Sequence, residues 1–273
     1  MLSYIKTLVS TVILASIWSC EEVVDINLDF AEPAFVVEAI ISKDSVCSVH
    51  LSRTAEYFSS EETEFVEDAV ITISDGNLSE ELIYKGKGYY KGSSLTGHEG
   101  LTYEIQIQQA GKTYRGISSM PEKAEILSIH YSMSTEVSIM NPFGDTVYII
   151  SCSFFDDPWI ENYYMITFKS QDELLEERFF LLTEYTANGG SFDNTGNIIN
   201  FAESIFCQGG VAEVRLYTID KQVYDYYLQL DDILFWKRRY IPPVPYNPKS
   251  NISNGALGCF AAWAVDAREI VLE

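Results

Sequence analysis

Apolar and polar residues alternate along the first part of the chain. Residues 47–52 (CSVHLS) switch between apolar and polar side chains at every position, which is the period of a half-buried β-strand. Residues 102–108 (TYEIQIQ) repeat this alternation, and residues 111–119 follow as a partner strand. Strand-like runs roughly 8–12 residues apart, with turn signals between them, predict a β-sandwich of the immunoglobulin-like or transthyretin-like type. We place this domain at residues 33–120.

The second part of the chain is also rich in strand-like runs. A series of β-branched and aromatic runs after residue 125 predicts a larger β-rich domain over residues 125–273. Residues 118–125, which contain a proline, are interpreted as the linker between the two domains. Residues 255–265 (GALGCFAAWAV) are small and apolar, and we expect them to close the second domain as a buried final strand.

One segment breaks the strand pattern. Within residues 219–236, apolar side chains recur at three- and four-residue steps, the spacing of an amphipathic α-helix. Thr218 or Asp220 would cap its N-terminus by accepting a backbone N–H, and the basic residues 237–239 would complement the dipole at its C-terminus. The predicted fold is therefore mainly β, with a sandwich, a larger β-rich domain and one amphipathic helix.

The first twenty residues differ from the rest of the chain. Residues 7–18 form an apolar segment of the length expected for a signal-peptide core. Crossing a bilayer takes about 20 apolar residues, so cleavage is preferred over a membrane-spanning helix. The junction IWSC resembles the bacterial lipoprotein processing box, which makes residues 1–19 a signal peptide and Cys20 the acylated N-terminus that holds the protein on a membrane. An uncleaved anchor, or an ordinary signal peptide cut elsewhere, is the alternative.

Acidic residues follow this cysteine directly. Glu21, Glu22 and Asp25 resemble the export signal with which Bacteroidota lipoproteins reach the outside of the outer membrane. The same residues fit an acidic tether, at residues 20–32, between the lipid and the folded part of the chain. The resemblance implies a lipid-anchored protein of the outer membrane that faces the cell exterior.

The charge balance excludes some classes of partner. The chain has 18 basic and 40 acidic side chains and a net charge of −22, which becomes −23 without residues 1–19 because Lys6 is lost. Nucleic acids and anionic lipid surfaces attract basic patches, so we expect no nucleic-acid binding and no charge-driven membrane docking. Diffuse acidity keeps a surface protein soluble, but it does not by itself define a calcium site.

Cysteines and histidines do not form a catalytic or metal-binding motif. Beyond Cys20, four cysteines lie far apart in apolar runs: Cys47, Cys152, Cys207 and Cys259. The sequence is compatible with buried free thiols and with disulfides at these positions. The sequence has no CxxC pair, which speaks against a zinc site. It also has no HxxxH or HExxH pair and no GxSxG motif. We therefore predict no metal, no cofactor and no enzyme activity, and we interpret the three histidines as surface residues.

One acidic and aromatic stretch is the strongest local candidate for ligand contact. Residues 154–164 (FFDDPWIENYY) combine carboxylates with aromatic rings, which stack well on sugars. The candidate ligand contacts are Trp159, Tyr163 and Tyr164. Carboxylates about 5–9.5 Å apart could hydrolyse a glycosidic bond, and the candidates for this role are Asp156, Asp157 and Glu161. An acidic turn between two strands, stopped by Pro158, explains the same residues and is the preferred interpretation.

The motifs taken together resemble one family. Their order is the basis: CEEVVDINL ahead of EPAFVVEAIIS, then VEDAVITISDG, GLTYEIQI with GKTYRGISSMP, and NPKSNISNGALGCFAAWAV. This order is similar to that of Bacteroidota surface lipoproteins with the domain of unknown function numbered 4249, and it covers nearly the whole chain after Cys20. The resemblance implies an outer-membrane lipoprotein, commonly encoded beside a TonB-dependent receptor, with no established catalytic residues. Ser45 and Thr146 also lie in tripeptides that fit O-glycosylation in these bacteria.

These observations predict a surface-exposed, non-enzymatic lipoprotein that serves TonB-dependent nutrient uptake. It would capture a small ligand of unknown identity or cover the outer mouth of the receptor. Two alternatives stay open. One is a surface glycan hydrolase that uses carboxylates such as Asp156 or Glu161, and the other is a structural or adhesive surface module.

Overall fold

A computed structural model of the chain describes residues 33–55, 63–135, 147–170, 179–183, 185, 191–195, 197–205, 210–234 and 246–273. Within these ranges the protein is mainly β, as predicted, with three sheets and one helix. No helix in the described part of the chain is long and apolar enough to cross a membrane. Several predicted features lie outside these ranges: the signal peptide, Cys20, Glu21, Glu22, Asp25, Thr146, Cys207 and residues 237–239.

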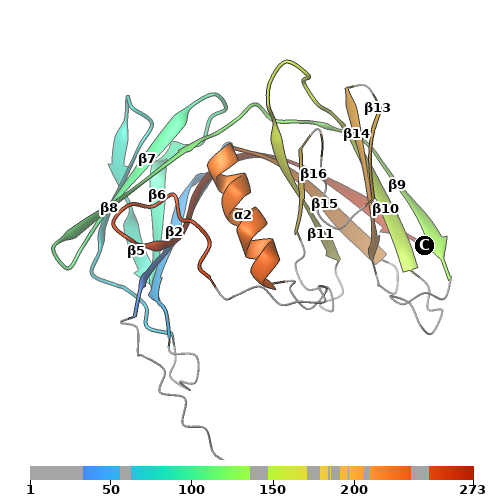
Figure 1. Cartoon of the computed structure of the whole chain (residues 1–273). Coiled ribbons are helices and arrows are strands. Elements are labelled where there is room, and N and C mark those ends of the chain that lie inside the picture. Colours follow the sequence, from blue (N-terminus) through green and yellow to red (C-terminus); the bar gives the residue numbers. More distant parts are fainter. Residues whose placement is uncertain are drawn as a thin grey trace, which may run out of the picture. The chain divides into compact units, whose positions relative to one another are not determined.

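The largest sheet contains strands from both halves of the chain (Figure 1). In spatial order its strands are β12 (Phe179–Leu182), β11 (Tyr163–Ser170), β15 (Gly210–Ile219), β16 (Leu257–Leu272), β1 (Phe35–Ser42), β2 (Val46–Arg53), β6 (Tyr89–Thr96) and β5 (Ile83–Gly86). Neighbouring strands pair antiparallel, except that β16 and β1 pair parallel. We call this sheet the long sheet.

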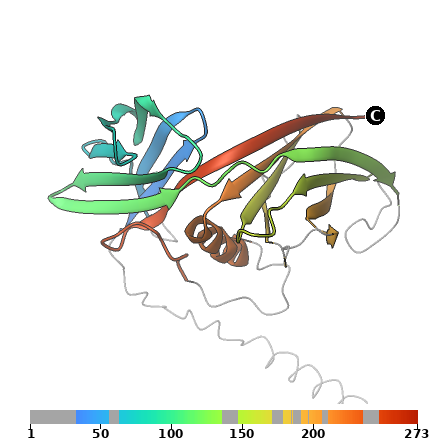
Figure 2. The ribbon, with the colours of Figure 1, turned by 90° about the horizontal axis from the view of Figure 1, so that it is seen from above.

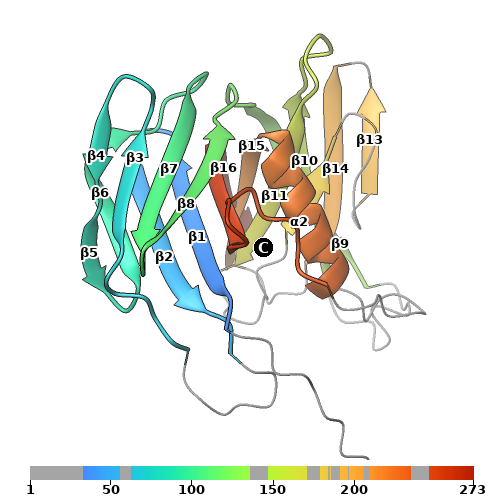
Figure 3. The ribbon, with the colours of Figure 1, turned by 60° about the vertical axis from the view of Figure 1, so that its left-hand side comes forward.

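A four-stranded sheet packs against each half of the long sheet. The first consists of β4 (Ser79–Glu81), β3 (Val70–Ser74), β7 (Thr102–Gln109) and β8 (Lys112–Ser119), in that order. Figure 3 shows β7 and β8 in front of β1 and β2, with which they form the first sandwich. The second sheet consists of β13 (Ser191–Thr195), β14 (Ile198–Ile205), β10 (Val147–Phe155) and β9 (Ile126–Ser134). It packs with β11, β12 and β15 to form the second sandwich.

The last strand, β16, takes part in both sandwiches (Figure 2, red). Alternate residues of a strand face opposite sides of the sheet. The even-numbered residues from 260 to 264 pack in the core of the first sandwich, and Leu272 packs in the core of the second. The odd-numbered residues from 259 to 263 pack on the opposite face, where α2 (Lys221–Leu234) lies. β16 is therefore covered on both faces over its first half.

This arrangement corrects the expectation that the final strand closes the second domain. The strand is present and buried, but residues 257–263 pair with β1 of the first sandwich, and residues 264–272 pair with β15. The close approach to β1 requires glycine at position 258, where φ is +90° and an added Cβ would lie 2.0 Å from the carbonyl oxygen of Val37. Residues 33–273 form one compact unit that contains both cores, and a boundary at residues 120–125 stays a prediction.

The helix forms where the spacing predicts it. α2 (Lys221–Leu234) lies within the predicted range of 219–236 and begins two residues later than predicted. Asp220 is its N-cap, because one carboxylate oxygen accepts the N–H of Val223 at 2.9 Å. The other candidate cap, Thr218, uses its hydroxyl oxygen to accept the N–H of Ala124 at 2.9 Å.

The cap of α2 also joins the helix to the first sandwich. The second carboxylate oxygen of Asp220 accepts hydrogen bonds from the hydroxyl of Ser118 at 2.6 Å and from the N–H of Ser119 at 2.9 Å. The hydroxyl oxygen of Ser118 in turn accepts the N–H of Ala262 at 2.9 Å. Ser118 is 1% exposed, so these polar groups depend on one another rather than on water.

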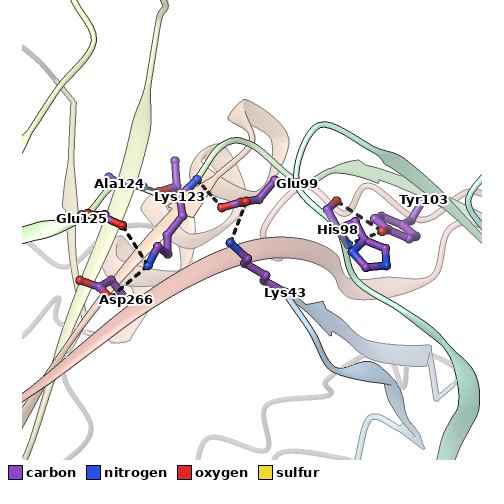
Figure 4. A network of polar contacts seen from close by, with 9 residues as sticks. Lys43, His98, Glu99, Tyr103, Lys123, Ala124, Glu125 and Asp266 are labelled. Atoms are coloured by element: carbon purple, nitrogen blue, oxygen red, sulfur yellow. Dashed lines mark hydrogen bonds and ion pairs between the residues drawn. The ribbon is translucent and has the colours of Figure 1, made fainter.

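The predicted linker is held against the sheets by polar contacts (Figure 4). The carboxylate of Glu99 accepts hydrogen bonds from the ammonium of Lys43 at 2.7 Å and from the N–H of Lys123 at 2.8 Å. The ammonium of Lys123 lies 3.4 Å from one carboxylate oxygen of Asp266. The other oxygen of Asp266 accepts the N–H of Ile126 at 2.9 Å. The segment between β8 and β9 is therefore bonded to β16.

We expect Ser118→Ala to lower the free energy of unfolding by about 1–3 kcal/mol, because it leaves the buried N–H of Ala262 without its acceptor. Ser119→Ala is the matched control. The Ser119 hydroxyl bonds the hydroxyl of Thr102 on an exposed face, and its loss should cost less than about 0.5 kcal/mol. Urea denaturation followed by tryptophan fluorescence measures both. Equal losses in the two variants would contradict the prediction.

The linker network also predicts a pH dependence. Burial by itself would raise the pKa of the Glu99 carboxyl, but hydrogen bonds from Lys43 and from the Lys123 N–H, with the charges of both lysines, outweigh burial and hold this pKa below its usual 4.5. A carboxyl whose pKa is lowered by folding stabilises the protein fully above its unfolded-state pKa, and this stabilisation is lost as the pH falls through the folded-state pKa.

We therefore expect the free energy of unfolding of the wild type to fall more steeply below about pH 4.5 than that of Glu99→Gln. Glu125→Gln is the control, because its carboxylate also lies near Lys123, at 3.5 Å, but is 69% exposed and screened by solvent. Denaturation curves between neutral pH and pH 3 test this. The same slope in the wild type and in Glu99→Gln would refute it.

Candidate functional site

α2 packs on the face of the long sheet that turns away from the two smaller sheets. The side chains of this face form rows across β12, β11 and β15, because cross-strand partners share a face. In order along the strands, the rows are Leu181–Met165–Tyr217, Phe179–Thr167–Arg215 and Lys169–Glu213. The first row packs with α2 in an apolar cluster. The face therefore changes from apolar to charged along the strands.

A cavity of about 190 Å³ lies beside α2 on this face. Among the described residues, five aromatic residues line it, from one helix and four different strands: Phe168, Phe179, Tyr217, Tyr227 and Trp263. The Phe168 side chain itself packs in the core of the second sandwich. Phe179 meets Tyr227 edge to face at 5.3 Å between ring centroids, and Tyr217 meets Trp263 in the same way at 5.0 Å. Such edge-to-face pairs fix the position of each ring. We call this cavity the aromatic groove.

In the part of the chain that the structure describes, the charged residues that line the aromatic groove are both cations, Lys169 and Arg215. The guanidinium of Arg215 lies 2.8 Å from a carboxylate oxygen of Glu213, and its side chain is 41% exposed. Hydrogen bonds with Glu213 and with the hydroxyl of Tyr217 raise the pKa of Arg215. Burial raises the pKa of Tyr227, so its hydroxyl stays protonated at neutral pH. The groove thus combines an apolar wall with a permanent positive charge.

The three aromatic residues predicted to contact a ligand are not brought together. Trp159 is 91% exposed in the turn between β10 and β11, whereas Tyr163 and Tyr164 are 8% and 2% exposed. Because adjacent strand residues face opposite sides, Tyr163 packs under α2 and Tyr164 packs in the core of the second sandwich. Both tyrosines are therefore buried, on opposite faces of β11, and their contact with a ligand stays a prediction.

The aspartates of the same stretch accept hydrogen bonds that hold the turn between β10 and β11. Asp156 is 4% exposed and accepts a hydrogen bond from the hydroxyl of Tyr164 at 2.6 Å. Asp157 accepts the N–H of Trp159 at 3.0 Å, as aspartates in turns commonly do. The preferred interpretation of these residues as an acidic turn between two strands is confirmed.

The cysteines in the described ranges are buried free thiols: Cys47, Cys152 and Cys259. Burial raises the pKa of Cys47 and of Cys152 to about 12, so neither is a reactive thiolate at neutral pH. Of the histidines, His98 and His130 are exposed as expected, but His50 is half-buried. The His50 ring stacks on Tyr89 at 4.2 Å between centroids and bonds the carboxylate of Glu38 at 2.8 Å.

Sequence patterns alone do not identify the aromatic groove. Its residues come from β11, β12, β15, β16 and α2, which are far apart along the chain. The alternation within GVAEVRLYTI, the sequence of β15, places Arg215 and Tyr217 on one face of a strand. This pattern was a usable signal, but it does not reveal which strand or helix lies beside that face.

Comparison with known proteins identifies a family. The model of the family described as "Domain of unknown function (DUF4249)" matches residues 21–269, which agrees with the resemblance inferred from the motifs. No curated protein matches the chain. A solved structure titled "Cytokine receptor complex" is 7% identical, covers 86% of this chain and 94% of its own, and superposes with a TM-score of 0.26. A similarity at that level carries no argument about fold or function.

We expect Tyr164→Phe to lower the free energy of unfolding by about 1–3 kcal/mol, because it removes the hydroxyl that donates to the buried Asp156. Trp159→Ala in the same turn should change it by less than about 0.5 kcal/mol, since the ring is exposed. Thermal or urea denaturation of both variants provides the measurement. A larger effect of Trp159→Ala would show that the turn is packed differently.

Proposed function

Because the chain belongs to the DUF4249 family, whose description names no activity, we propose a function from the molecule itself. The protein is a lipid-anchored, surface-exposed accessory of a TonB-dependent nutrient uptake system, and it captures a small ligand. The observation that carries this proposal is the aromatic groove beside α2. Ligand sites are typically concave, lined by apolar and aromatic side chains, with a few polar groups that orient the ligand. The groove has all of these features.

The N-terminal sequence supports the location. Residues 1–19 have the pattern of a lipoprotein signal peptide, and Cys20 would carry the acyl chains. Glu21, Glu22 and Asp25 resemble the export signal of Bacteroidota lipoproteins, which would place the protein on the outer face of the outer membrane. The TonB-dependent receptor as partner is taken from the family resemblance alone.

The proposed function is non-catalytic because the carboxylates that could act as a glycosidase acid or base accept hydrogen bonds from neighbouring groups of the protein. Asp156 is buried and accepts the Tyr164 hydroxyl, Asp157 accepts a backbone N–H within its turn, and Glu161 accepts the Tyr163 hydroxyl. A glycosidase acid or base must reach the substrate, and the buried Asp156 does not. These contacts favour ligand capture over the hydrolase alternative.

The test is native purification in mild detergent from cells that express the wild type or Cys20→Ser. We expect the wild type to incorporate labelled palmitate, to be accessible to protease on intact cells, and to co-purify with a β-barrel receptor. Cys20→Ser should lose the label and leave the membrane fraction, because the acyl chains are its anchor. Cys259→Ser is the control, since this thiol is buried and free, and it should keep the label. Wild-type protein that carries a lipid but binds no receptor would refute the uptake role.

A further inference from the structure

We propose that the aromatic groove binds a small organic anion with a single planar apolar group, such as an aryl carboxylate. This inference rests on the ligand-capture function proposed above and names the chemical class of its ligand. The apolar group would lie among the rings of Phe179, Tyr227 and Trp263, and the anionic group would lie at Arg215 and Lys169.

The size of the groove limits the apolar part of the ligand. Pockets for drug-sized ligands usually measure about 300–1,000 Å³, and this groove measures about 190 Å³. A single ring therefore fits, whereas an oligosaccharide or a peptide would extend far beyond it. The walls are suited to a flat group, because the ring pairs Phe179–Tyr227 and Tyr217–Trp263 are already in edge-to-face contact and can offer ring faces and edges to a further ring.

The wall at Trp263 is held in place before any ligand arrives. The indole N–H of Trp263 donates to the hydroxyl of Ser42 at 2.7 Å, and the residue is 7% exposed. A side chain that is already ordered loses little conformational entropy on binding. The groove is thus preorganised on its apolar side.

The charges that line the groove indicate an anion. The chain has 40 acidic and 18 basic residues, yet the charged residues among the described lining are Lys169 and Arg215. Glu213 pairs with Arg215 and lies directly across the strands from Lys169, so the described residues at this end of the groove carry one positive charge in excess. A second hollow on the other side of α2, of about 250 Å³, has one charged residue of each sign in its described lining, Asp225 and Lys249.

Arg215 is suited to a carboxylate in its geometry as well as its charge. A guanidinium has five N–H donors in a fixed plane, and the contacts with Glu213 and Tyr217 hold this plane while leaving further donors for a ligand. Arginine forms two parallel hydrogen bonds with one carboxylate, which lysine does not. A cationic ligand would be repelled here, and a neutral one would leave these donors to water.

The experiment compares three probes that share one ring and differ in charge: 4-fluorophenylacetate, 2-(4-fluorophenyl)ethanol and 4-fluorophenethylamine. Fluorine NMR line widths are recorded with the lipidated wild-type protein in detergent micelles and with protein-free micelles. We expect saturable broadening for the acetate only. Broadening of all three probes to the same extent, or of none, would overturn the proposal.

Two variants locate the site. Arg215→Gln should weaken binding of the acetate by about tenfold, the size of one charge-assisted hydrogen bond, and Arg215→Lys should restore only part of it because the paired donors are lost. Arg115→Gln removes the same charge on β8, where the side chain is 61% exposed, and should leave binding unchanged. Equal weakening by Arg115→Gln and Arg215→Gln would refute the groove as the site. A protein that reaches the surface and its receptor but does not bind the acetate would refute the ligand class and not the uptake function.

Discussion

The structure depends on a single strand that is shared by both sandwiches. β16 pairs with β1 along one edge and with β15 along the other. One of its faces packs in two cores in succession, and the other carries α2. This is possible because side chains alternate along a strand and because residues 259–264 (CFAAWA) are all apolar. A charged side chain at either face of this run would be buried without a partner, which proteins rarely tolerate.

Polar groups connect the two sandwiches around this strand. On one side, Ser118 bonds both β16 and the capping carboxylate of Asp220. On the other, Asp266 of β16 holds the segment that contains Lys123. Buried polar groups of this kind require their specific partners, because an unpaired group in a low-dielectric interior is costly. Hydrogen-bond geometry, in addition to apolar area, therefore specifies how the helix and the linker lie on the sheet.

The aromatic groove is a consequence of this arrangement. Asp220 holds the start of α2 beside β8, and the helix then covers only part of the outer face of the long sheet. The rows that follow along the strands contain Arg215 and Lys169, so the boundary between the apolar and the charged part of the face lies beside the helix. A site with apolar walls and a cationic end arises there, and the proposed ligand chemistry follows from that boundary.

Local patterns in the sequence were enough to predict the mainly β class, individual strands such as residues 102–108, and the helix with Asp220 among its caps, because each reflects the period of a local backbone conformation. They also predict the lipoprotein N-terminus, which lies outside the described residues. They could not place Tyr163 and Tyr164, because alternation shows that neighbours face opposite sides but not what covers each side. Only the tertiary structure decided that β16 serves both cores and that Arg215 lies near Trp263 in one groove, since strand pairing and layer packing depend on contacts between residues far apart in the chain.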